Sequence, residues 1–521
     1  MPSKQAHKQK SQKKVTTTQS NQQKFLKYSS FLLMPALLLA WCVGYYSVGG
    51  EIIGLNRGFG WDGVTYGSFA YIFDTLLATP VLDPYLAQRV LPSGLIHYAL
   101  PFLGIDLDSK KNILQAFIVL NTICVTVSGG LWAAIAAKLR LSLKVQWLGF
   151  IALFCNCAVM KMSVYYPPLT DVPAFFLSML ALLCYVYRFQ TLLYLVSALA
   201  YFTFPTGFYI CSVLIILPFA PLQTHNRLAS TSTDFFDKRI PIVITSVAIL
   251  VAGAFIWYFA FFKKVVFPGT ESIFEPTLLI AIPLMLGYIG GIVWIVSSLL
   301  PWQYILNILK DKFFWVRVGS VGLLWGFLLF CRIHFLQNPD PRVATPMNVQ
   351  LFFGGSFSLS IAKPLLPFVS HVVYFGPMVI LVALFFRSII QSSLQQTGLG
   401  IVVVITITAL MSGIMSESRQ LINLIPFMMF GVAVAMSGRN VQRWHIGVVA
   451  VVGIFCSKCW VQMNYPDIQT SSFLSGKLVV FPAQWYFMNF GPWMSMVSYV
   501  WQISIITVIG LAYAFIFLRS K

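Results

Sequence analysis

The sequence predicts an all-α fold, a polytopic transmembrane helical bundle of about 14 spans (12–14) that each need about 20 apolar residues. Composition carries most of this prediction. The 521 residues are 58% hydrophobic and only 10% charged, and their mean hydropathy is +0.79. Soluble domains carry about 25% charged residues, so this chain is expected to lie in lipid. In addition, apolar stretches of spanning length recur from Tyr28 to the end of the chain.

The first 27 residues are polar, carry seven lysines and no acid, and are expected to form a disordered cytoplasmic tail. No small-residue cleavage site follows, so the span Tyr28 to Val48 is expected to be a signal anchor that delivers the next loop to the outer face. Residues 28–521 are then a single transmembrane domain with long outer loops at 49–112, 335–368 and 464–495. The remaining spans are expected to begin at Ile113, Val145, Val172, Leu192, Phe208, Pro241, Thr277, Trp315, Val369, Leu399, Leu421, Trp444 and Met496. An even number of spans returns the C-terminus to the cytoplasm.

The stretch from Leu192 to Leu222 is long and mostly apolar, with Pro205, Thr206 and Gly207 in its middle. Proline and glycine interrupt helices, so the stretch is expected to form two short helices rather than one long helix.

The net charge of +20 is spread along the chain. In a membrane protein such an excess indicates cytoplasmic loops and contacts with anionic lipid headgroups rather than nucleic-acid binding. The nine cysteines are scattered among apolar residues and are interpreted as packing residues. His97, His334 and His371 share no spacing typical of a metal site, and each is expected to be a lone hydrogen-bonding side chain.

Asp62 is the first candidate for chemistry, because it heads the first outer loop in the sequence Phe59-Gly60-Trp61-Asp62-Gly63-Val64-Thr65-Tyr66. The glycines allow a sharp bend or a close approach to a ligand. Trp61 and Tyr66 suit a membrane interface and can stack on a sugar ring. Asp62 is therefore a candidate general base. The alternative is an Asp-Gly turn that leads into an amphipathic helix.

Arg89 follows in the same loop, between two expected interfacial helices, Ser68 to Leu77 and Ser93 to Phe102. A planar guanidinium can bind a lipid-linked phosphate through two hydrogen bonds. The alternative is an arginine that snorkels to headgroups without specificity.

Two shorter outer turns also carry charge. Asp171 begins the helix after the proline-rich turn at 165–173, where it is either an acid beneath Asp62 or a carboxylate stabilised by the helix dipole. Glu417 and Arg419 flank a tight turn between two apolar helices, where they either bind substrate or form an ion pair with each other. Weaker candidates are Pro339 to Arg342 and an aromatic stretch at 489–493.

Taken together, these motifs resemble the GT-C superfamily of integral-membrane glycosyltransferases, of the type that depends on polyprenyl-phosphate sugars. The resemblance covers most of the chain through short motifs: Trp61-Asp62-Gly63 with a tyrosine three residues on, Arg89-Val90-Leu91-Pro92, Asp171 at a helix start, and Glu417-Ser418-Arg419 followed by Pro426. It implies transfer of a hexosyl or pentosyl group from a polyprenyl-phosphate donor to a glycan, lipid or protein acceptor at the outer face.

The family resemblance also implies roles for residues. Asp62 would be the base of an inverting displacement, and Arg89 and Arg419 would offset charge on the departing phosphate. Many relatives pair two adjacent acids in the first loop, whereas glycine follows Asp62 here. We therefore expect no bound metal and no cofactor, with Asp171 as the second acid.

Other classes stay open at this point. A polymerase or ligase for lipid-linked polysaccharide, a flippase or transporter, and a non-catalytic subunit of a glycosylation complex are the alternatives. Transporters often show two related halves and charged groups at mid-bilayer, and no repeat is evident here. The chain lacks an Asn-x-Ser/Thr acceptor, which favours a bacterial inner membrane and a role in the cell envelope.

Overall fold

In the computed structural model, residues 30–222, 234–258, 275–338, 360–461, 463–464 and 496–519 are described. The expected basic tail, Pro339 to Arg342 and the aromatic stretch at 489–493 lie outside the described residues. Most of the expected outer loops at 335–368 and 464–495 lie outside them too.

The described chain is helical. After a helix at Ser30–Ser47, the elements are η1 (Leu55–Gly58), α2 (Asp62–Ala78), η2 (Leu86–Gln88), α3 (Leu91–Phe102), α4 (Lys110–Lys138), α5 (Leu143–Phe154), α6 (Cys157–Met160), α7 (Met162–Tyr165), α8 (Asp171–Tyr187), α9 (Gln190–Tyr201), α10 (Thr206–Ile216), α11 (Asp234–Ile256), α12 (Glu275–Leu299), α13 (Trp302–Lys310), α14 (Lys312–Phe335), α16 (Leu366–Phe375), α17 (Pro377–Gln396), α18 (Leu399–Ile414), η7 (Ser418–Leu421), α19 (Ile425–Met436), α20 (Arg443–Ser457) and α23 (Met496–Arg519). Extended pairing within this part of the chain is limited to an isolated bridge between Leu82 and Gln337.

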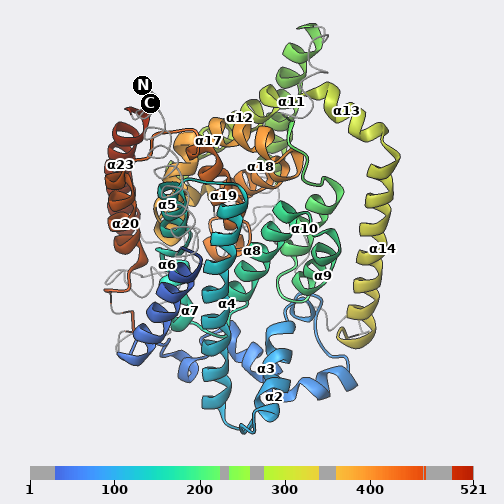
Figure 1. Cartoon of the computed structure of the whole chain (residues 1–521), viewed down its shortest axis with the longest axis vertical. Helices are drawn as coiled ribbons and strands as arrows, with labels where there is room; N and C mark the ends of the chain where they lie inside the picture. Colours follow the sequence, from blue (N-terminus) through green and yellow to red (C-terminus); the bar gives the residue numbers. More distant parts are fainter. Residues whose placement is uncertain are drawn as a thin grey trace, which may run out of the picture.

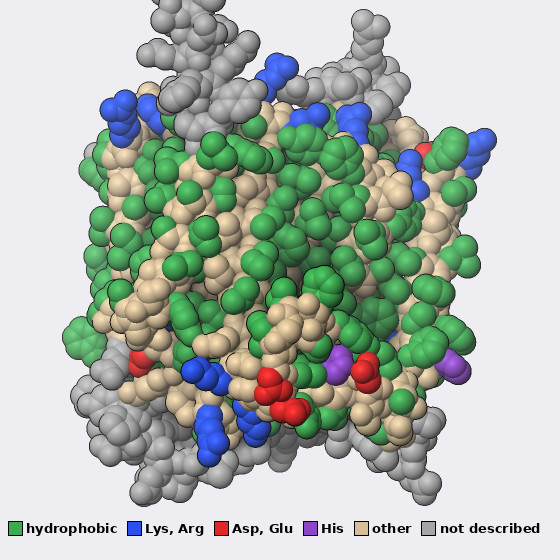
Figure 2. All heavy atoms as spheres, turned by 60° about the horizontal axis from the view of Figure 1, so that its bottom comes forward, with side chains coloured by type: hydrophobic (Ala, Val, Ile, Leu, Met, Phe, Trp, Pro, Cys, Tyr) green, Lys and Arg blue, Asp and Glu red, His purple; other side chains and the backbone are tan. Residues whose placement is uncertain are grey.

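Seven described helices are long and apolar enough to cross a membrane, and the bent pair formed by α5 and α6–α7 would make an eighth. Seven further apolar helices are shorter, at 10–17 residues. Figure 2 shows a broad apolar band between two rims of charged side chains, with most of the visible acids at one rim. The helix lengths and this band indicate a membrane protein, because a spanning helix must satisfy its backbone internally and face lipid with apolar side chains.

The core lies where the short helices meet the long ones. All residues of α19 are buried, and this helix packs mainly against α5 and α17. The expected break between Leu192 and Leu222 is confirmed, because α9 ends at Tyr201 and α10 begins at Thr206. Several helices begin where a side chain caps them: Ser109, Ser142 and Asn156 each accept a hydrogen bond from a backbone N–H three residues on.

One end of the bundle is built by α2 and α3, which pack against each other and against α4 and lie at the lower end in Figure 1. We call this the α2–α3 end. The C-terminal end of α23 lies at the opposite end of the bundle (Figure 1). Helices are present where the sequence predicts them at 68–77 and 93–102, within the longer α2 and α3.

Candidate active site

Three charged side chains, remote in sequence, meet at the α2–α3 end. Arg419 donates from Nη2 to Oδ2 of Asp62 at 2.9 Å and from Nε to Oε1 of Glu417 at 2.5 Å. The side chains of Asp62 and Glu417 are 44% and 41% exposed, whereas that of Arg419 is 21% exposed. Burial alone would lower the pKa of Arg419, but Glu417 and Asp62 outweigh it and raise the pKa. The cation is thus shared by two carboxylates that both reach solvent.

The loop around Asp62 is held by contacts that need its glycines. Gly60 has φ +64°, and a Cβ on it would lie 2.4 Å from the ring of Tyr166. The backbone N–H of Gly63 donates to the Tyr166 hydroxyl at 3.3 Å. Only glycine allows this approach and this backbone conformation without strain. Tyr166 belongs to the proline-rich turn before α8, so the two outer loops position Asp62 together.

Arg89 lies in the same region without an ion pair to any described residue. Its guanidinium lies over the rings of Tyr85 and Phe204, at 4.4 Å and 4.3 Å from their centres. Its Nη1 donates to the Thr170 hydroxyl at 3.4 Å, and its Nε has no hydrogen-bond partner among the described residues. The residue is only 6% exposed. Arginine between two aromatic faces keeps its positive charge and its hydrogen-bonding edge available for an anion.

The turn that carries Arg89 is set by Asp83. One carboxylate oxygen of Asp83 accepts from the backbone N–H groups of Tyr85 and Leu86, at 2.7 Å and 2.9 Å. This local turn starts η2, and Arg89 follows directly after it.

Asp171 begins α8 and is almost fully buried, at 7% exposed. Its Oδ2 has no hydrogen-bond partner among the described residues. Burial raises the pKa of Asp171 to about 6, although Arg419 and Arg89 act in the opposite direction. Asp171 is therefore electrostatically coupled to both arginines, as well as to Glu417 and Asp62.

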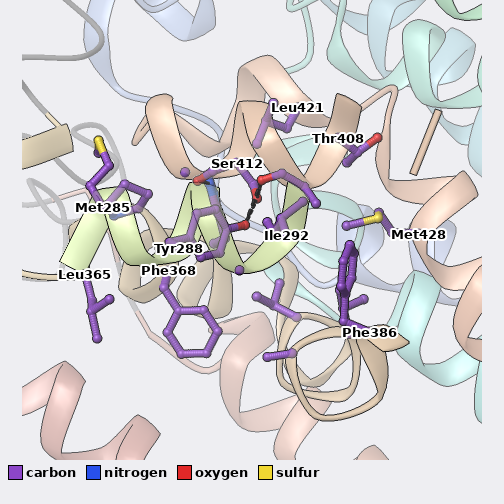
Figure 3. A pocket seen from close by; sticks show the side chains of 18 of the residues that line it. Met285, Tyr288, Ile292, Leu365, Phe368, Phe386, Thr408, Ser412, Leu421 and Met428 are labelled. Carbon is purple, nitrogen blue, oxygen red and sulfur yellow. Dashed lines mark hydrogen bonds between the residues drawn. The ribbon is translucent and has the colours of Figure 1, made fainter. Parts of the chain in front are cut away.

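A cavity of about 370 Å³ lies behind the turn that carries Arg419. Its walls come from α12, α16, α17, α18 and α19, and Leu421 of η7 reaches it. Figure 3 shows that side chains such as Met285, Ile292, Phe386 and Met428 surround the space, with Tyr288 bonded to Ser412. Ligand sites have typical volumes of about 300–1,000 Å³, and this cavity is apolar except for a few hydroxyls and one histidine.

Most of the residues expected at a site converge here. Asp62, Arg419 and Glu417 are in direct contact. Tyr66 is buried, and its hydroxyl is electrostatically coupled to Arg89 and Asp62. Trp61 precedes Asp62 at the start of α2 and is 43% exposed.

Other members of the site were not expected. Tyr85, Phe204 and Thr170 surround Arg89, and Tyr166 supports the Asp62 loop. Tyr85 and Arg89 are four residues apart, and Tyr166 and Thr170 lie in the same turn as Asp171. Those spacings could have indicated from the sequence that Tyr85, Tyr166 and Thr170 belong to the site. Nothing in the sequence links Phe204 to Arg89.

Lys161 is a buried lysine of the kind that a transporter would place within the bilayer, and here it has structural partners. Lys161 donates to Glu51 at 3.0 Å and to the backbone oxygen of Val461. Glu51 also accepts from the backbone N–H groups of Met463 and Asn464. This ion pair joins the start of the first outer loop to residues after α20.

Two of the three histidines, His97 and His371, form hydrogen bonds as expected, whereas the contacts of His334 are with the rings of Phe330 and Phe335. His97 contacts the backbone oxygen of Ala70 at 2.8 Å and Asp74 at 3.2 Å. His371 is bonded through both ring nitrogens, to Ser418 and Ser412. Within the described part of the chain, no three His, Cys, Asp or Glu side chains lie close enough together to hold a metal ion.

The fold and site define a helical protein of membrane type with a charged, partly exposed cluster at one end and an apolar cavity beside it. Comparison of the chain with protein-family models, with curated proteins and with solved structures gives no match. The function is therefore inferred from the site.

Proposed function

We propose that this protein is a membrane glycosyltransferase that moves a sugar from a polyprenyl-phosphate-linked donor to an acceptor hydroxyl. The observation that carries the proposal is that a half-exposed carboxylate, Asp62, and a buried arginine without a carboxylate partner among the described residues, Arg89, share the neighbours Tyr66 and Asp171. The first can accept a proton, and the second can bind the phosphate of a donor. Sugar transfer from a lipid phosphate needs both groups at one site.

In the proposed reaction the acceptor oxygen attacks the anomeric carbon, and its proton passes to Asp62. The bond between the anomeric carbon and the phosphate oxygen breaks, and its electron pair leaves with the phosphate. A single displacement inverts the anomeric centre. Arg89 offsets the charge that grows on the phosphate, while Arg419 holds Asp62 in place through their 2.9 Å bond.

The cavity supports a lipid-linked donor rather than a soluble one. It lies next to Arg419 through Leu421 and is walled largely by apolar side chains, which suits a hydrocarbon chain. Trp61 is exposed beside Asp62 and offers a flat face for a sugar ring. The acceptor would approach from this exposed side.

The proposal includes a topology of about 14 spans, each with about 20 apolar residues where it crosses fully. Both termini would be cytoplasmic, the α2–α3 end would face the periplasm, and the membrane would be a bacterial inner membrane. The long helices and the bent pair give up to eight spans, so a count of about 14 requires that most of the seven short helices also cross, each on its own.

A flippase or transporter is the second candidate. The observation that disfavours it is Lys161, which lies between α6 and α7 and whose charge is paired with Glu51 at the start of the first outer loop. Transport sites place charged groups at the middle of the bilayer and leave them open to substrate.

The test replaces Asp62 by Asn and measures sugar transfer from a polyprenyl-phosphate donor in proteoliposomes. A positioned base contributes about 10²–10⁴-fold, so the variant is expected to lose transfer by that factor. Asp74→Asn is the matched control, because Asp74 is an exposed acid in the same helix whose bonds within the described part of the chain are to Tyr98 and His97. Equal rates for wild type and Asp62→Asn would overturn the proposal.

A further inference from the structure

The turn that carries Glu417 and Arg419 is tied to the cavity wall by one histidine. His371 lines the cavity and is 3% exposed. Its Nδ1 lies 2.8 Å from the hydroxyl of Ser418, and its Nε2 lies 2.9 Å from the backbone oxygen of Ser412. Ser418 is the residue between Glu417 and Arg419, so a single side chain bridges the cavity and the charged cluster.

The partners decide how His371 is protonated. A backbone carbonyl oxygen only accepts, so Nε2 carries the hydrogen and donates to Ser412. Nδ1 is then the acceptor, and the Ser418 hydroxyl donates to it. The Ser412 carbonyl lies in the last turn of α18, where helices leave carbonyl groups without an intrahelical partner. His371 thus fixes the end of α18 and the start of η7 at once.

Tyr288 links the end of α18 to α12, which forms another wall of the cavity. Its hydroxyl donates to the Ala409 oxygen at 2.7 Å and lies 2.9 Å from the Ser412 hydroxyl. Tyr288 belongs to α12, and it lies beside Ser412 in the cavity in Figure 3. A chain that enters the cavity must pack against α12, α18 and His371 together.

We infer that the cavity holds the hydrocarbon chain of a lipid phosphate, and that His371 is a positioning residue through which this chain orders the Glu417–Arg419 turn. The inference rests on the proposed function for the identity of the lipid. It follows from continuity: His371 and Leu421 line the apolar cavity, His371 is bonded to Ser418, and the next residue, Arg419, belongs to the charged cluster. A bound chain would restrict His371, and through Ser418 it would restrict the turn that holds Asp62.

The experiment measures hydrogen exchange of backbone amides in the full chain in nanodiscs. The probes are a long-chain polyprenyl phosphate and, as a headgroup without a chain, inorganic phosphate. Peptides from α12 that line the cavity report its occupancy, and peptides that contain Ser418 and Arg419 report the turn. In the wild type we expect the long-chain lipid to protect both segments and inorganic phosphate to protect neither.

Two variants break the same hydrogen bond from opposite sides. Ser418→Ala removes the hydroxyl, and His371→Gln keeps a donor for the Ser412 carbonyl but withdraws the acceptor from Ser418. Both are expected to keep the protection of α12 and to lose protection of the turn by roughly 3- to 10-fold in exchange rate, the effect of one hydrogen bond. Ser370→Ala is the matched control, because Ser370 lies next to His371 in α16 but bonds to the Leu366 oxygen of its own helix and is not among the residues that line the cavity.

Unchanged protection of the turn in Ser418→Ala overturns the inference, and so does a wild type whose turn is not protected by the lipid. Hydrogen exchange is measured without turnover, so the coupling through His371 and the transferase activity are tested independently. Protection of the turn without sugar transfer would reject the transferase and keep the coupling. Transfer that depends on Asp62, with full protection in Ser418→Ala, would reject the coupling alone.

Discussion

Arg89 and Arg419 carry the same charge but have different partners. Arg419 bonds to two carboxylates, so little of its charge is left for a substrate. Arg89 is stacked between two rings and bonds only to a hydroxyl among the described residues. The family resemblance implies phosphate contacts for both, and the structure favours a division of roles. Arg89 would bind the phosphate, and Arg419 would position the base.

Replacing Arg89 by Gln is expected to lower kcat/KM for the donor by roughly 10- to 100-fold, the effect of lost hydrogen bonds to a charged group. The kcat/KM of Arg89→Lys is expected to lie between those of Arg89→Gln and the wild type. Lysine keeps the charge but loses the planar face that stacks on Tyr85 and Phe204. Steady-state kinetics with varied donor measures this. Arg57→Gln, an exposed arginine of the same loop, is the control. Equal losses in both variants would contradict the assignment.

The buried carboxyl of Asp171 gives a prediction for pH. Burial raises its pKa to about 6 in the folded protein, above its ordinary value, so the folded state holds the proton more tightly than the unfolded state does. The contribution of Asp171 to stability is complete below its ordinary pKa and is lost as the pH rises through about 6, with a size on the order of 3 kcal/mol.

The measurement compares thermal unfolding of the wild type with that of Asp171→Asn from about pH 4.5 to about pH 7.5. Asparagine does not titrate, so the stability of Asp171→Asn relative to that of the wild type is expected to increase as the pH rises. A difference that stays constant across this window would show that the carboxyl is not buried as described.

At the scale of elements, the short connections between helices carry the tightest constraints. Gly398 lies between α17 and α18 with φ +99°, and a Cβ on it would lie 2.4 Å from the backbone oxygen of Ala220. That oxygen belongs to the backbone, so it cannot rotate away. The turn therefore needs glycine for its conformation and for its space.

Gly398→Ala is expected to destabilise the protein by about 1–3 kcal/mol, the usual size of local backbone strain. Gly438→Ala is the matched control, because it is also in a turn between helices and a Cβ there meets no atom within 4 Å. Apparent melting temperatures in detergent report the difference. A melting temperature for Gly398→Ala equal to that of the control would contradict the described packing of α17 and α18.

At the scale of the whole molecule, the acids visible in Figure 2 lie mostly at one rim. This is the rim that the proposed topology places at the outer face of the membrane. The C-terminal end of α23 lies at the other end of the bundle (Figure 1), which fits a chain with an even number of crossings. The proposed topology places these two ends on opposite sides of the membrane.

Cysteine labelling tests that topology. Asp106→Cys and Gly438→Cys introduce exposed thiols at the two ends, in a background without the nine native cysteines. A membrane-impermeant maleimide is expected to label Asp106→Cys in intact cells, and Gly438→Cys only after permeabilisation. The reverse pattern would place Asp62 in the cytoplasm and would remove the basis for a periplasmic enzyme.

The sequence by itself determined the class of fold and several elements. Composition and recurrent apolar stretches predicted a helical membrane protein, because hydropathy is summed over local residues and needs no partner. The same holds for the break between α9 and α10, which follows from proline and glycine, and for the presence of α2 and α3, although α2 begins at Asp62 rather than at the expected Ser68. The number of spans stays a prediction, since short and bent apolar helices look alike whether they cross a bilayer or only enter it.

Only the tertiary structure decided which charged residues meet. Asp62 and Arg419 are 357 residues apart, and Glu417 bonds to the same guanidinium. The stacking of Phe204 on Arg89 and the link from His371 to Ser418 have no signature in the sequence. Such contacts depend on how helices pack across the whole bundle, and a pattern read along one chain holds no information on that packing.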